Sequence, residues 1–278
     1  MATKSSIMDT NSYSDDYSSL LSNTTRDMIN RREKWMGGAY RLFYRKPVNL
    51  VRGQGQYLWD AEGNKYLDMY NNVAGIGHCH PAVVEAVTEQ MKLLNTHTRY
   101  LHERIIDYSE DLLKMMPDEI DKIMFMCTGS EANDLALRVA QEYTGGTGII
   151  VSREAYHGTS ALTSGCSPAL GSEQPLLPNV RTGDAFWGFA RQGIIPDMVT
   201  TGKPMGNGIP ISGLAAKHEV LAAFSDKLPY FNTFGGNPVA IAAAQAVLNV
   251  IKEEKLQEHC KVVGAKLLKA LQEVKDRH

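Results

Sequence analysis

The sequence has no long apolar run and no strong excess of charge of either sign. Its hydrophobic stretches are interrupted by Lys, Glu, Gln or Gly well before the roughly 18 residues that a membrane-spanning helix needs. The 29 basic and 31 acidic residues give a formal net charge of −2, which does not favour nucleic acid or an acidic membrane surface as a partner. We therefore predict neither a membrane partner nor a nucleic-acid partner.

Cysteine is scarce, and the N-terminal segment has no apolar core. The four cysteines show neither paired spacing nor the spacing of metal ligands, so we predict reduced thiols in a cytoplasmic protein. Residues 1–25 are rich in Ser and Thr but contain Asp9, Asp15 and Asp16, unlike a signal or transit peptide. We interpret this segment as a polar arm.

What the sequence does contain is the periodicity of an α/β protein. The predicted strands are 123–128, 148–152, 198–201 and 211–217, and a β-hairpin within 48–71 turns at 61–64. The predicted helices are 26–35, 81–94, 99–116, 131–143, 184–193, 238–251 and a last one from 255 onwards. The strand, helix and strand of 123–152 form a βαβ unit, which is typical of a parallel sheet.

The motif CTGSEAND (127–134) joins a strand end to a helix start. Free backbone N–H groups and the helix dipole favour an anion at such a point, Gly129 permits close approach, and Ser130 adds a hydroxyl. The same residues also fit an ordinary serine N-cap, because Ser-Glu-Ala-Asn resembles half a capping box. On this motif alone the N-cap is the simpler interpretation.

Two further motifs carry side chains suited to ligands. Tyr156 and His157 follow a strand, at the edge where α/β sheets bind ligands, and the Tyr156 ring suits stacking on a flat ligand; a core tyrosine beside a turn is the alternative. His78-Cys79-His80 has the ligand types of zinc, but a zinc site needs more ligands at a fitting distance. His97 and His102 are the nearest histidines, without a cysteine pair, so we predict no metal.

Lys203 follows an apolar strand in the motif GKPMGNG (202–208). Burial among small residues disfavours the charged amine and favours a nucleophile suited to Schiff-base chemistry, whereas a surface turn is the alternative. Thr233 offers a hydroxyl before another helix in TFGGNP (233–238). A site for a phosphate at a helix start, an aromatic ring that can stack and a lysine that can react with a carbonyl carbon are together what pyridoxal phosphate needs.

These motifs occur in the order found in class III pyridoxal-phosphate aminotransferases, which the chain resembles from about Gly37 to its C-terminus. The motifs are GHCHP (77–81), CTGSEANDLALR (127–138), AYHG (155–158), TGDAFWGF (182–189), GKPMGNG (202–208) and FNTFGGNP (231–238). NNVAGIGHCHP, LNTHTRYLHE and KPMGNG are most similar to the branch with the ethanolamine-phosphate and phosphohydroxylysine phospho-lyases. The resemblance implies a large domain of the aspartate-aminotransferase-like fold, with a mixed, mostly parallel sheet.

The resemblance also implies residue roles. The implied cofactor-binding residues are Gly129, Ser130, Tyr156, His157, Lys203 and Thr233. Lys203 is the catalytic residue, which forms the Schiff base and moves the substrate proton; Gly129 and Ser130 hold the phosphate, and Tyr156 stacks on the ring. Thr233 reaches the cofactor of the neighbouring subunit, which implies a homodimer.

The implied reaction transfers an amino group from a small amine or amino acid to a keto acid. A phospho-lyase reaction on a phosphorylated amine is the alternative, because both reactions begin at the same Schiff base. A degenerate homologue without catalysis is an alternative of a different class.

The chain departs from the family pattern between its aromatic motif and its lysine. The interval from Tyr156 to Lys203 has room for about one βαβ unit of about 30 residues, where the family has several βα units. The absent stretch carries Asp-Glu-Val-Gln, whose aspartate pairs with the pyridine nitrogen, and neither Asp184 nor Asp197 matches it. We infer an in-frame deletion at Arg181-Thr182, with residues omitted from the sequence as the rival explanation.

Four segments follow from these interpretations. Residues 1–36 form an N-terminal arm and helix, and 37–95 form a hairpin and helix segment. Residues 96–251 form an incomplete pyridoxal-phosphate-binding large domain, and 252–278 begin a C-terminal domain that we expect to be truncated. With an internal segment and the small C-terminal domain missing, we expect impaired turnover.

Overall fold

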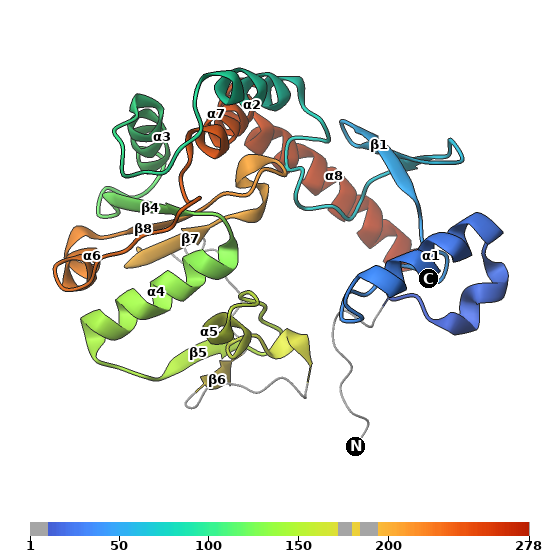
Figure 1. Ribbon diagram of the computed structural model, residues 1–278, viewed down its shortest axis with the longest axis horizontal. Coiled ribbons are helices and arrows are strands. Elements are labelled where there is room, and N and C mark those ends of the chain that lie inside the picture. Colours follow the sequence, from blue (N-terminus) through green and yellow to red (C-terminus); the bar gives the residue numbers. More distant parts are fainter. Residues whose placement is uncertain (1–10, 172–179, 184–193, 278) are drawn as a thin grey trace.

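Three β-sheets lie among helices in the described part of this computed structural model, which comprises residues 11–171, 180–183 and 194–277 (Figure 1). The strands are β1 (Leu50–Gln54), β2 (Tyr57–Asp60), β3 (Lys65–Leu67), β4 (Lys122–Met126), β5 (Ile149–Ser152), β6 (Val180–Gly183), β7 (Met198–Thr201) and β8 (Ser212–Ala216). The α-helices are α1 (Asn23–Trp35), α2 (Pro81–Leu93), α3 (Glu103–Leu113), α4 (Gly129–Thr144), α5 (Ala161–Ser164), α6 (His218–Ser225), α7 (Pro238–Glu253) and α8 (Leu256–Arg277). Short 3₁₀ helices are η2 (Asp15–Leu20), η3 (Pro168–Leu170) and η5 (Lys203–Gly206).

The central sheet brings the ends of two distant strands to one edge. Its order is β4-β8-β7, and β4 and β7 both run antiparallel to β8 between them. Met126, the last residue of β4, lies opposite Ser212, and Thr201, the last residue of β7, lies opposite Gly213. The residues that follow β4 and β7 therefore leave the sheet side by side.

Helices cover both faces of this sheet (Figure 1). Successive side chains of a strand point to opposite faces, and β4 shows this directly. Met126 packs with Leu135 of α4 and Phe224 of α6 on one face. Phe125 packs with Tyr108 of α3 and with α7 on the other face. Each face of the sheet thus has its own apolar core.

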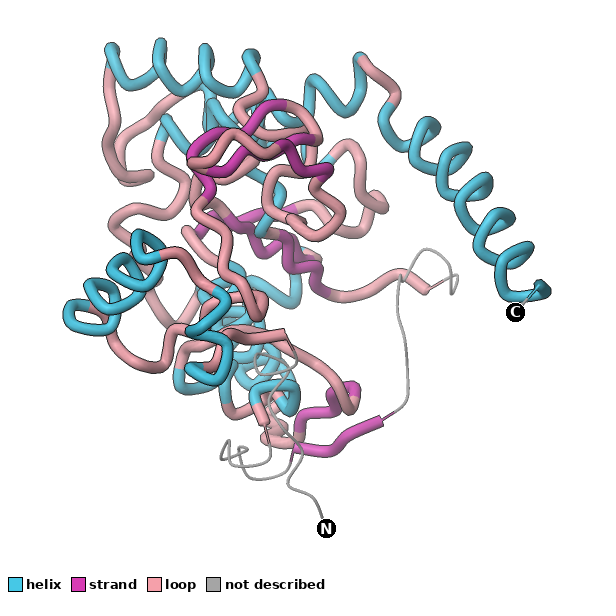
Figure 2. The backbone as a smooth tube through the Cα atoms, turned by 90° about the vertical axis from the view of Figure 1, so that its right-hand side faces the viewer, coloured by secondary structure: helices cyan, strands magenta, loops and turns pink. Residues whose placement is uncertain are grey.

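The helix α7 is the most enclosed of the described helices. It begins at Pro238, whose missing N–H suits a first helical position, and the Asn237 side chain caps it by accepting from the N–H of Ala240 at 3.0 Å. Its small Ala and Val side chains are buried nearly all round, because α7 contacts α2, α3 and the sheet. The following helix, α8, has no buried residue, and Figure 2 shows it running to the C-terminus at the margin of the molecule.

Most predicted elements are confirmed within a few residues. The strand predicted at 198–201 is β7, and the helix predicted at 81–94 is α2. The helix predicted at 99–116 is shorter, since α3 spans Glu103–Leu113. The hairpin at 61–64 is present between β2 and β3, and β1 extends it to three antiparallel strands. The helix predicted at 184–193 lies outside the described residues.

The prediction of a simple βαβ unit across 123–152 is wrong in its pairing. The order β4, α4, β5 is present, but β5 pairs in parallel with β6 and not with β4. The 16-residue helix α4 rises about 1.5 Å per residue, and this crossover carries the chain past the central sheet. Pairing among the described strands is therefore more antiparallel than we expected, because β8 runs between β4 and β7.

None of the described helices has the length and apolar character needed to cross a bilayer.

Candidate functional site

A cavity of about 500 Å³ opens where the loops after β4, β5 and β7 meet. This volume lies within the usual range for sites that bind small molecules. The lining consists of residues 127–130, 156–158, 200–203 and 208–211, with Val73 and Asn133. The cavity thus brings together five of the six cofactor-binding residues that the sequence predicts: Gly129, Ser130, Tyr156, His157 and Lys203.

The start of α4 forms one wall of this cavity. Thr128 is the N-cap: its Oγ1 accepts from the N–H of Glu131 at 3.2 Å, and the Glu131 carboxylate accepts from the N–H of Thr128 at 2.8 Å. The capping box is therefore complete, but the cap is Thr128 rather than Ser130. The first N–H groups of a helix have no partner within it, and a Cβ added to Gly129 would meet nothing within 4 Å. The helix end is thus open to an anion.

Gly158 lets the loop 156–160, which carries Tyr156, approach this helix end. Its φ is 133°, a conformation that side chains rarely adopt, and an added Cβ would lie 2.7 Å from the Cα of Ser130. The Ser130 hydroxyl accepts from the N–H of Thr159 at 3.0 Å, and its own hydrogen remains to be donated. The glycine and the hydroxyl together hold the loop against the first turn of α4.

Two more side chains of α4 fasten the same loop. Asn133 donates through Nδ2 to the carbonyl oxygen of His157 at 2.8 Å. Asp134 accepts through Oδ1 from the Ser160 hydroxyl at 3.0 Å. These contacts place the Tyr156 ring, which is 52% exposed, at the cavity wall.

His157 leaves a polar atom without a partner beside the cavity. Its Nε2 is buried and has no hydrogen-bond partner in the described structure. Burial lowers the pKa of His157, because a low-dielectric environment disfavours the imidazolium. The ring therefore favours the neutral form.

Glu131 also joins the cavity to a distant loop. Its Oε1 accepts from Asn232 Nδ2 at 2.9 Å, and Asn232 Oδ1 accepts from the N–H of Gly235 at 2.9 Å. A Cβ at Gly235 would lie 3.0 Å from the Cα of Met126, so only glycine allows this approach to β4. Thr233 is exposed and lies outside the cavity lining, unlike the other five predicted residues.

Lys203 lies at the first position of η5, directly after β7. Its φ of 44° is left-handed, which costs a non-glycine residue roughly 1–2 kcal/mol. Its side chain is exposed at the cavity rim, so the prediction that burial among small residues activates its amine is wrong for this structure. Among the glycines near Lys203, Gly206 is required by packing, because an added Cβ there would lie 2.9 Å from Cγ2 of Ile211.

Cys127 lines the cavity but is not arranged as a nucleophile. Burial and then the negative charge of Glu131 raise the pKa of its thiol, which favours the unreactive protonated form. All four cysteines of the chain are unpaired.

The His78-Cys79-His80 motif has a structural arrangement. His78 Nε2 lies 2.7 Å from Asp68 Oδ2, and the His78 backbone exchanges two hydrogen bonds with Gly55. Burial alone would raise the pKa of Asp68, but hydrogen bonds from the N–H of Asn71 and from His78 lower it overall. No group of three or more potential metal-binding side chains occurs among residues 11–171, 180–183 and 194–277.

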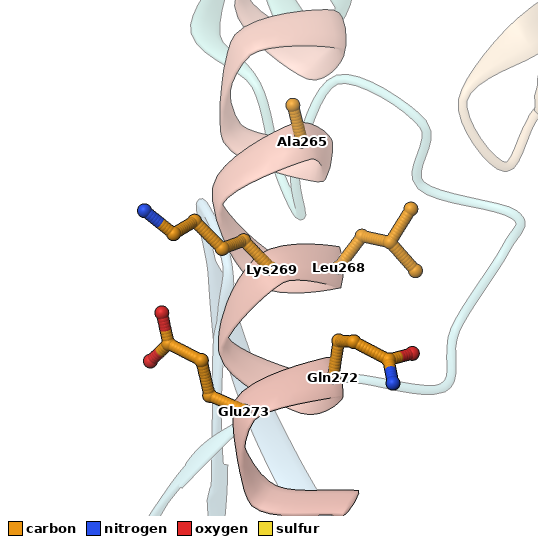
Figure 3. Close-up of a pocket in the computed structure, with 5 residues that line it drawn as sticks. All are labelled: Ala265, Leu268, Lys269, Gln272 and Glu273. Atoms are coloured by element: carbon orange, nitrogen blue, oxygen red, sulfur yellow. The ribbon is translucent and has the colours of Figure 1, made fainter. Parts of the chain in front are cut away.

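A second hollow lies on the surface of α8, and one helix provides all of it. Figure 3 shows its residues, with Lys269 and Glu273 on one side of the helix and Leu268 and Gln272 on the other. No other element contributes to its lining, so converging groups of the kind that define a binding site are missing there.

Sequence reasoning missed the side chains that hold these loops together, namely Glu131, Asn133, Asp134 and Asn232. One signal was available, because residues three and four apart share a helix face. Ser130, Asn133 and Asp134 have this spacing and form a polar face on the first turns of α4. The link from Glu131 to Asn232 has no comparable local signal.

The family model that describes class III aminotransferases matches residues 43–175 and 179–278. A fruit-fly (Drosophila melanogaster) protein named alanine–glyoxylate aminotransferase 2-like is 32% identical, covering 90% of this chain and 70% of its own length. A Caenorhabditis elegans protein named ethanolamine-phosphate phospho-lyase homolog 1 is 30% identical, covering 91% of this chain and 76% of its own length. Both similarities extend over nearly the whole chain.

Solved structures show the same relationship. An Arthrobacter phospholyase in complex with phosphoethanolamine superposes with a TM-score of 0.84 at 31% identity, covering 89% of this chain and 79% of that one. An ornithine aminotransferase from Toxoplasma gondii, 22% identical with a TM-score of 0.74, shares the fold and covers 90% of this chain and 76% of its own.

The comparisons also bear on the missing internal segment. The alignment with the fruit-fly relative runs over 345 residues, more than the 278 of the whole chain, so residues of the relative lie opposite gaps here. The family match is interrupted at 176–178, next to the junction inferred at Arg181-Thr182. With its motifs, its fold and both sets of relatives in agreement, this chain belongs to the pyridoxal-phosphate-dependent class III aminotransferase family.

Proposed function

We propose that the cavity is an aminotransferase site that moves an amino group from a small amine or amino acid to a keto acid. One observation carries the proposal: Lys203 and the open N-terminus of α4 line the same cavity. An anion-binding helix end and a nucleophilic amine are the two groups that pyridoxal phosphate needs at its opposite ends.

The residues of the cavity fit the phosphate end of the cofactor. Gly129 and Ser130 present N–H groups at the helix start, where the dipole favours negative charge, and the open space over Gly129 leaves room for an anion. The Ser130 hydroxyl accepts one hydrogen bond from Thr159 and donates its hydrogen to the phosphate. We therefore propose these two residues as the phosphate-binding pair.

The ring end fits the aromatic loop. Tyr156 stacks on the ring, and Asn133 fixes the loop by its bond to His157. When bound, pyridoxal phosphate supplies an aldehyde that captures amines and a conjugated ring that accepts electrons from the neighbouring carbon.

The Lys203 amine would hold the cofactor through its aldehyde carbon until the substrate amine takes its place. The freed Lys203 amine would then accept the proton from the carbon next to the substrate nitrogen. The exposed position of Lys203 at the cavity rim leaves its amine accessible for this transfer. We propose slow turnover, because the described lining residues include no Asp or Glu to pair with the pyridine nitrogen.

Reduction with borohydride tests the role of Lys203. Incubation with pyridoxal phosphate, reduction and peptide mass analysis are expected to place the cofactor on Lys203 in the wild type. The variant Lys203→Ala should lose that attachment, while Lys266→Ala, on exposed α8, should keep it. Attachment of equal yield in Lys203→Ala refutes the assignment, and a folded wild type that binds no cofactor favours a non-catalytic homologue.

A phospho-lyase activity is the second candidate, favoured by the superposition on a phospholyase that binds phosphoethanolamine. The two activities differ in their products. With a phosphorylated amine, a phospho-lyase releases phosphate, ammonia and an aldehyde, and needs no keto acid. Phosphate release without a keto acid would support this candidate, whereas amino transfer that requires a keto acid would support the first.

We also propose that a second copy of this chain covers the surface around Thr233. Phe231 and Phe234 beside it are exposed, and the ring of His97 contacts the rings of Tyr100 and Phe231 at centroid distances of 5.0 and 5.8 Å. Aromatic surface of this kind favours association. In such a dimer Thr233, which lies away from its own cavity, reaches the phosphate of the neighbouring subunit.

Light scattering tests the dimer. The wild type is expected to be dimeric, and Phe234→Glu to be monomeric with weaker cofactor binding. Leu268→Glu, on the exposed surface of α8, adds the same charge away from this surface and should stay dimeric. A monomeric wild type contradicts the proposal.

A cytoplasmic location remains our prediction, although two of the relatives are named mitochondrial proteins.

A further inference from the structure

The turn that carries Lys203 is packed tightly on both sides. Gly206 is buried, and an added Cβ there would lie 2.9 Å from Ile211. On the other side, an added Cβ at Gly75 would lie 3.0 Å from Pro204. Lys203 and Asn207, at the two ends of this turn, both have left-handed backbones, with φ of 44° and 49°. Such a conformation persists only where surrounding contacts fix it.

Asn207 supplies such a contact from its side chain. Its Oδ1 accepts from the N–H of Ile76 at 3.2 Å, and its Nδ2 donates to the carbonyl oxygen of Gly77 at 2.8 Å. One amide thus satisfies a donor and an acceptor on neighbouring residues of a segment far away in sequence. The Asn207 side chain thus links the turn 203–207, which we call the lysine turn, to residues 76–77.

The segment that Asn207 holds is itself anchored. Gly77 has a φ of 101°, and an added Cβ there would lie 3.0 Å from the Cα of Gly55. His78 exchanges backbone hydrogen bonds with Gly55 at 2.8 and 3.0 Å, which ties the segment to the loop between β1 and β2. The same segment leads back to Val73 at the cavity lining. Asn207 therefore joins the lysine turn to an anchored wall of the cavity.

We propose that Asn207 is a positioning residue for Lys203. By fixing the far end of the turn to residues 76–77, it holds the Lys203 backbone in its left-handed conformation and aims the amine at the cavity. This inference rests on the proposed covalent role of Lys203. It assigns Asn207 no contact with the reacting atoms.

The chemistry of asparagine fits both demands at this position. Asparagine tolerates the left-handed region better than most residues with a Cβ, and its amide offers one acceptor and a donor. Glycine also tolerates the conformation but has no amide. Aspartate keeps the acceptor toward Ile76 but turns a second acceptor toward the Gly77 carbonyl, at the position where Nδ2 now donates.

Two variants separate the brace from the backbone conformation. Asn207→Gly keeps the left-handed backbone and removes both hydrogen bonds, and Asn207→Asp keeps the side-chain size and removes the donation. Asn249→Asp is the matched control, because it introduces the same charge at an exposed position and keeps an oxygen that accepts from Gln245. If Asn207→Gly does not fold, Asn207→Asp carries the test alone.

The readout is the rate at which pyridoxal phosphate becomes fixed to Lys203, followed by borohydride quenching and peptide mass analysis. We expect both Asn207 variants to react about fivefold to tenfold more slowly than the wild type, as the loss of hydrogen bonds predicts. Asn249→Asp should match the wild type. In the cofactor-free protein, the amide of Ile76 should exchange its hydrogen faster in Asn207→Gly than in the control.

The outcomes separate the two proposals. If the wild type attaches the cofactor to Lys203 and both folded Asn207 variants do so at the same rate, the positioning role is refuted alone. If the folded wild type never attaches the cofactor to Lys203, the proposed function fails and the positioning role fails with it. Slow attachment in both variants with normal attachment in Asn249→Asp supports the inference.

Discussion

At the scale of single residues, the candidate site depends on positions where nothing but hydrogen fits. Gly158 allows its loop to contact Ser130 at the start of α4, and Gly235 allows its loop to contact the backbone of β4. The contact at Gly158 brings the loop 156–160 to the cavity wall that the start of α4 forms, and the contact at Gly235 holds a second loop against β4. The sequence shows such glycines as turn residues, and their partners appear only in the folded chain.

Gly158→Ala is expected to destabilise the protein and to abolish cofactor binding. The added Cβ would lie 2.7 Å from the Cα of Ser130, at a φ of 133°, and strain of this kind costs at least about 1–3 kcal/mol. Urea unfolding and a cofactor titration measure both effects. The control Gly264→Ala lies in α8 with open space around it and should stabilise by up to about 1 kcal/mol; equal behaviour of the two variants contradicts the expectation.

The lowered pKa of Asp68 leads us to expect that the folded protein loses stability at acid pH. Its folded pKa is lowered below 3.8 overall, although burial acts in the opposite direction. A carboxyl with a lowered pKa contributes stability above its unfolded pKa and loses that stability as pH falls through the folded value. The wild type should therefore lose stability below about pH 4.

Asp68→Asn removes this contribution. The variant should be less stable than the wild type at neutral pH, and the gap should be narrower at about pH 3, because the contribution of Asp68 declines as pH falls below its unfolded pKa and toward its lowered folded pKa. Urea denaturation at both pH values gives the comparison. A gap that is constant across this range would show that the Asp68 charge does not contribute.

At the scale of elements, α4 organises the site more than any other described helix. Its first turns contact the loop 156–160 through Ser130, Asn133 and Asp134. The carboxylate of Glu131 completes the capping box and reaches the loop at 231–235. One helix start therefore joins the loop 156–160 at the cavity to the loop at 231–235 outside it.

Glu131→Ala is expected to loosen the whole cluster. It removes the capping box and the contact with Asn232, and we expect a loss of about 1–2 kcal/mol in the free energy of unfolding. Chemical denaturation measures this loss, and a cofactor titration should show weaker binding. Glu273→Ala on exposed α8 is the control; an equally stable Glu131→Ala protein would mean that the box contributes little.

The same helix shows how far the sequence predicts structure. Local signals located α4 to within two residues, since the apolar spacing and the capping residues are neighbours in sequence, but they took Ser130 rather than Thr128 as its N-cap. They could not identify the neighbours of β5, because strand pairing depends on where the crossover ends. They also could not place Lys203 at an exposed rim, because burial depends on the packing of distant segments.

At the scale of the whole molecule, the site is a joint product of distant segments. Residues after β4, β5 and β7 line one cavity, and Asn207 adds a brace to residues 76–77. The division into segments 1–36, 37–95, 96–251 and 252–278 remains a prediction. The cavity draws residues from the second and third of these segments.

Pyridoxal phosphate is therefore expected to stabilise the entire fold. A ligand that binds only the folded state raises the free energy of unfolding by about 2.7 kcal/mol at a concentration 100-fold above its dissociation constant. Urea unfolding with and without the cofactor measures the gain, and Lys203→Ala should show a smaller one. An unfolding curve that does not move with saturating cofactor would contradict an assembled site.

The bond between Glu131 and Asn232 has a consequence for how the protein is made. These residues are 101 positions apart, and contacts of long sequence separation form late because they must first close a long loop. A chain emerging from the ribosome can build β4 and α4 early, yet it lacks the partner of Glu131 until Asn232 has been synthesised and released. Binding of the cofactor during synthesis would therefore be delayed until nearly the whole chain has been made and has folded.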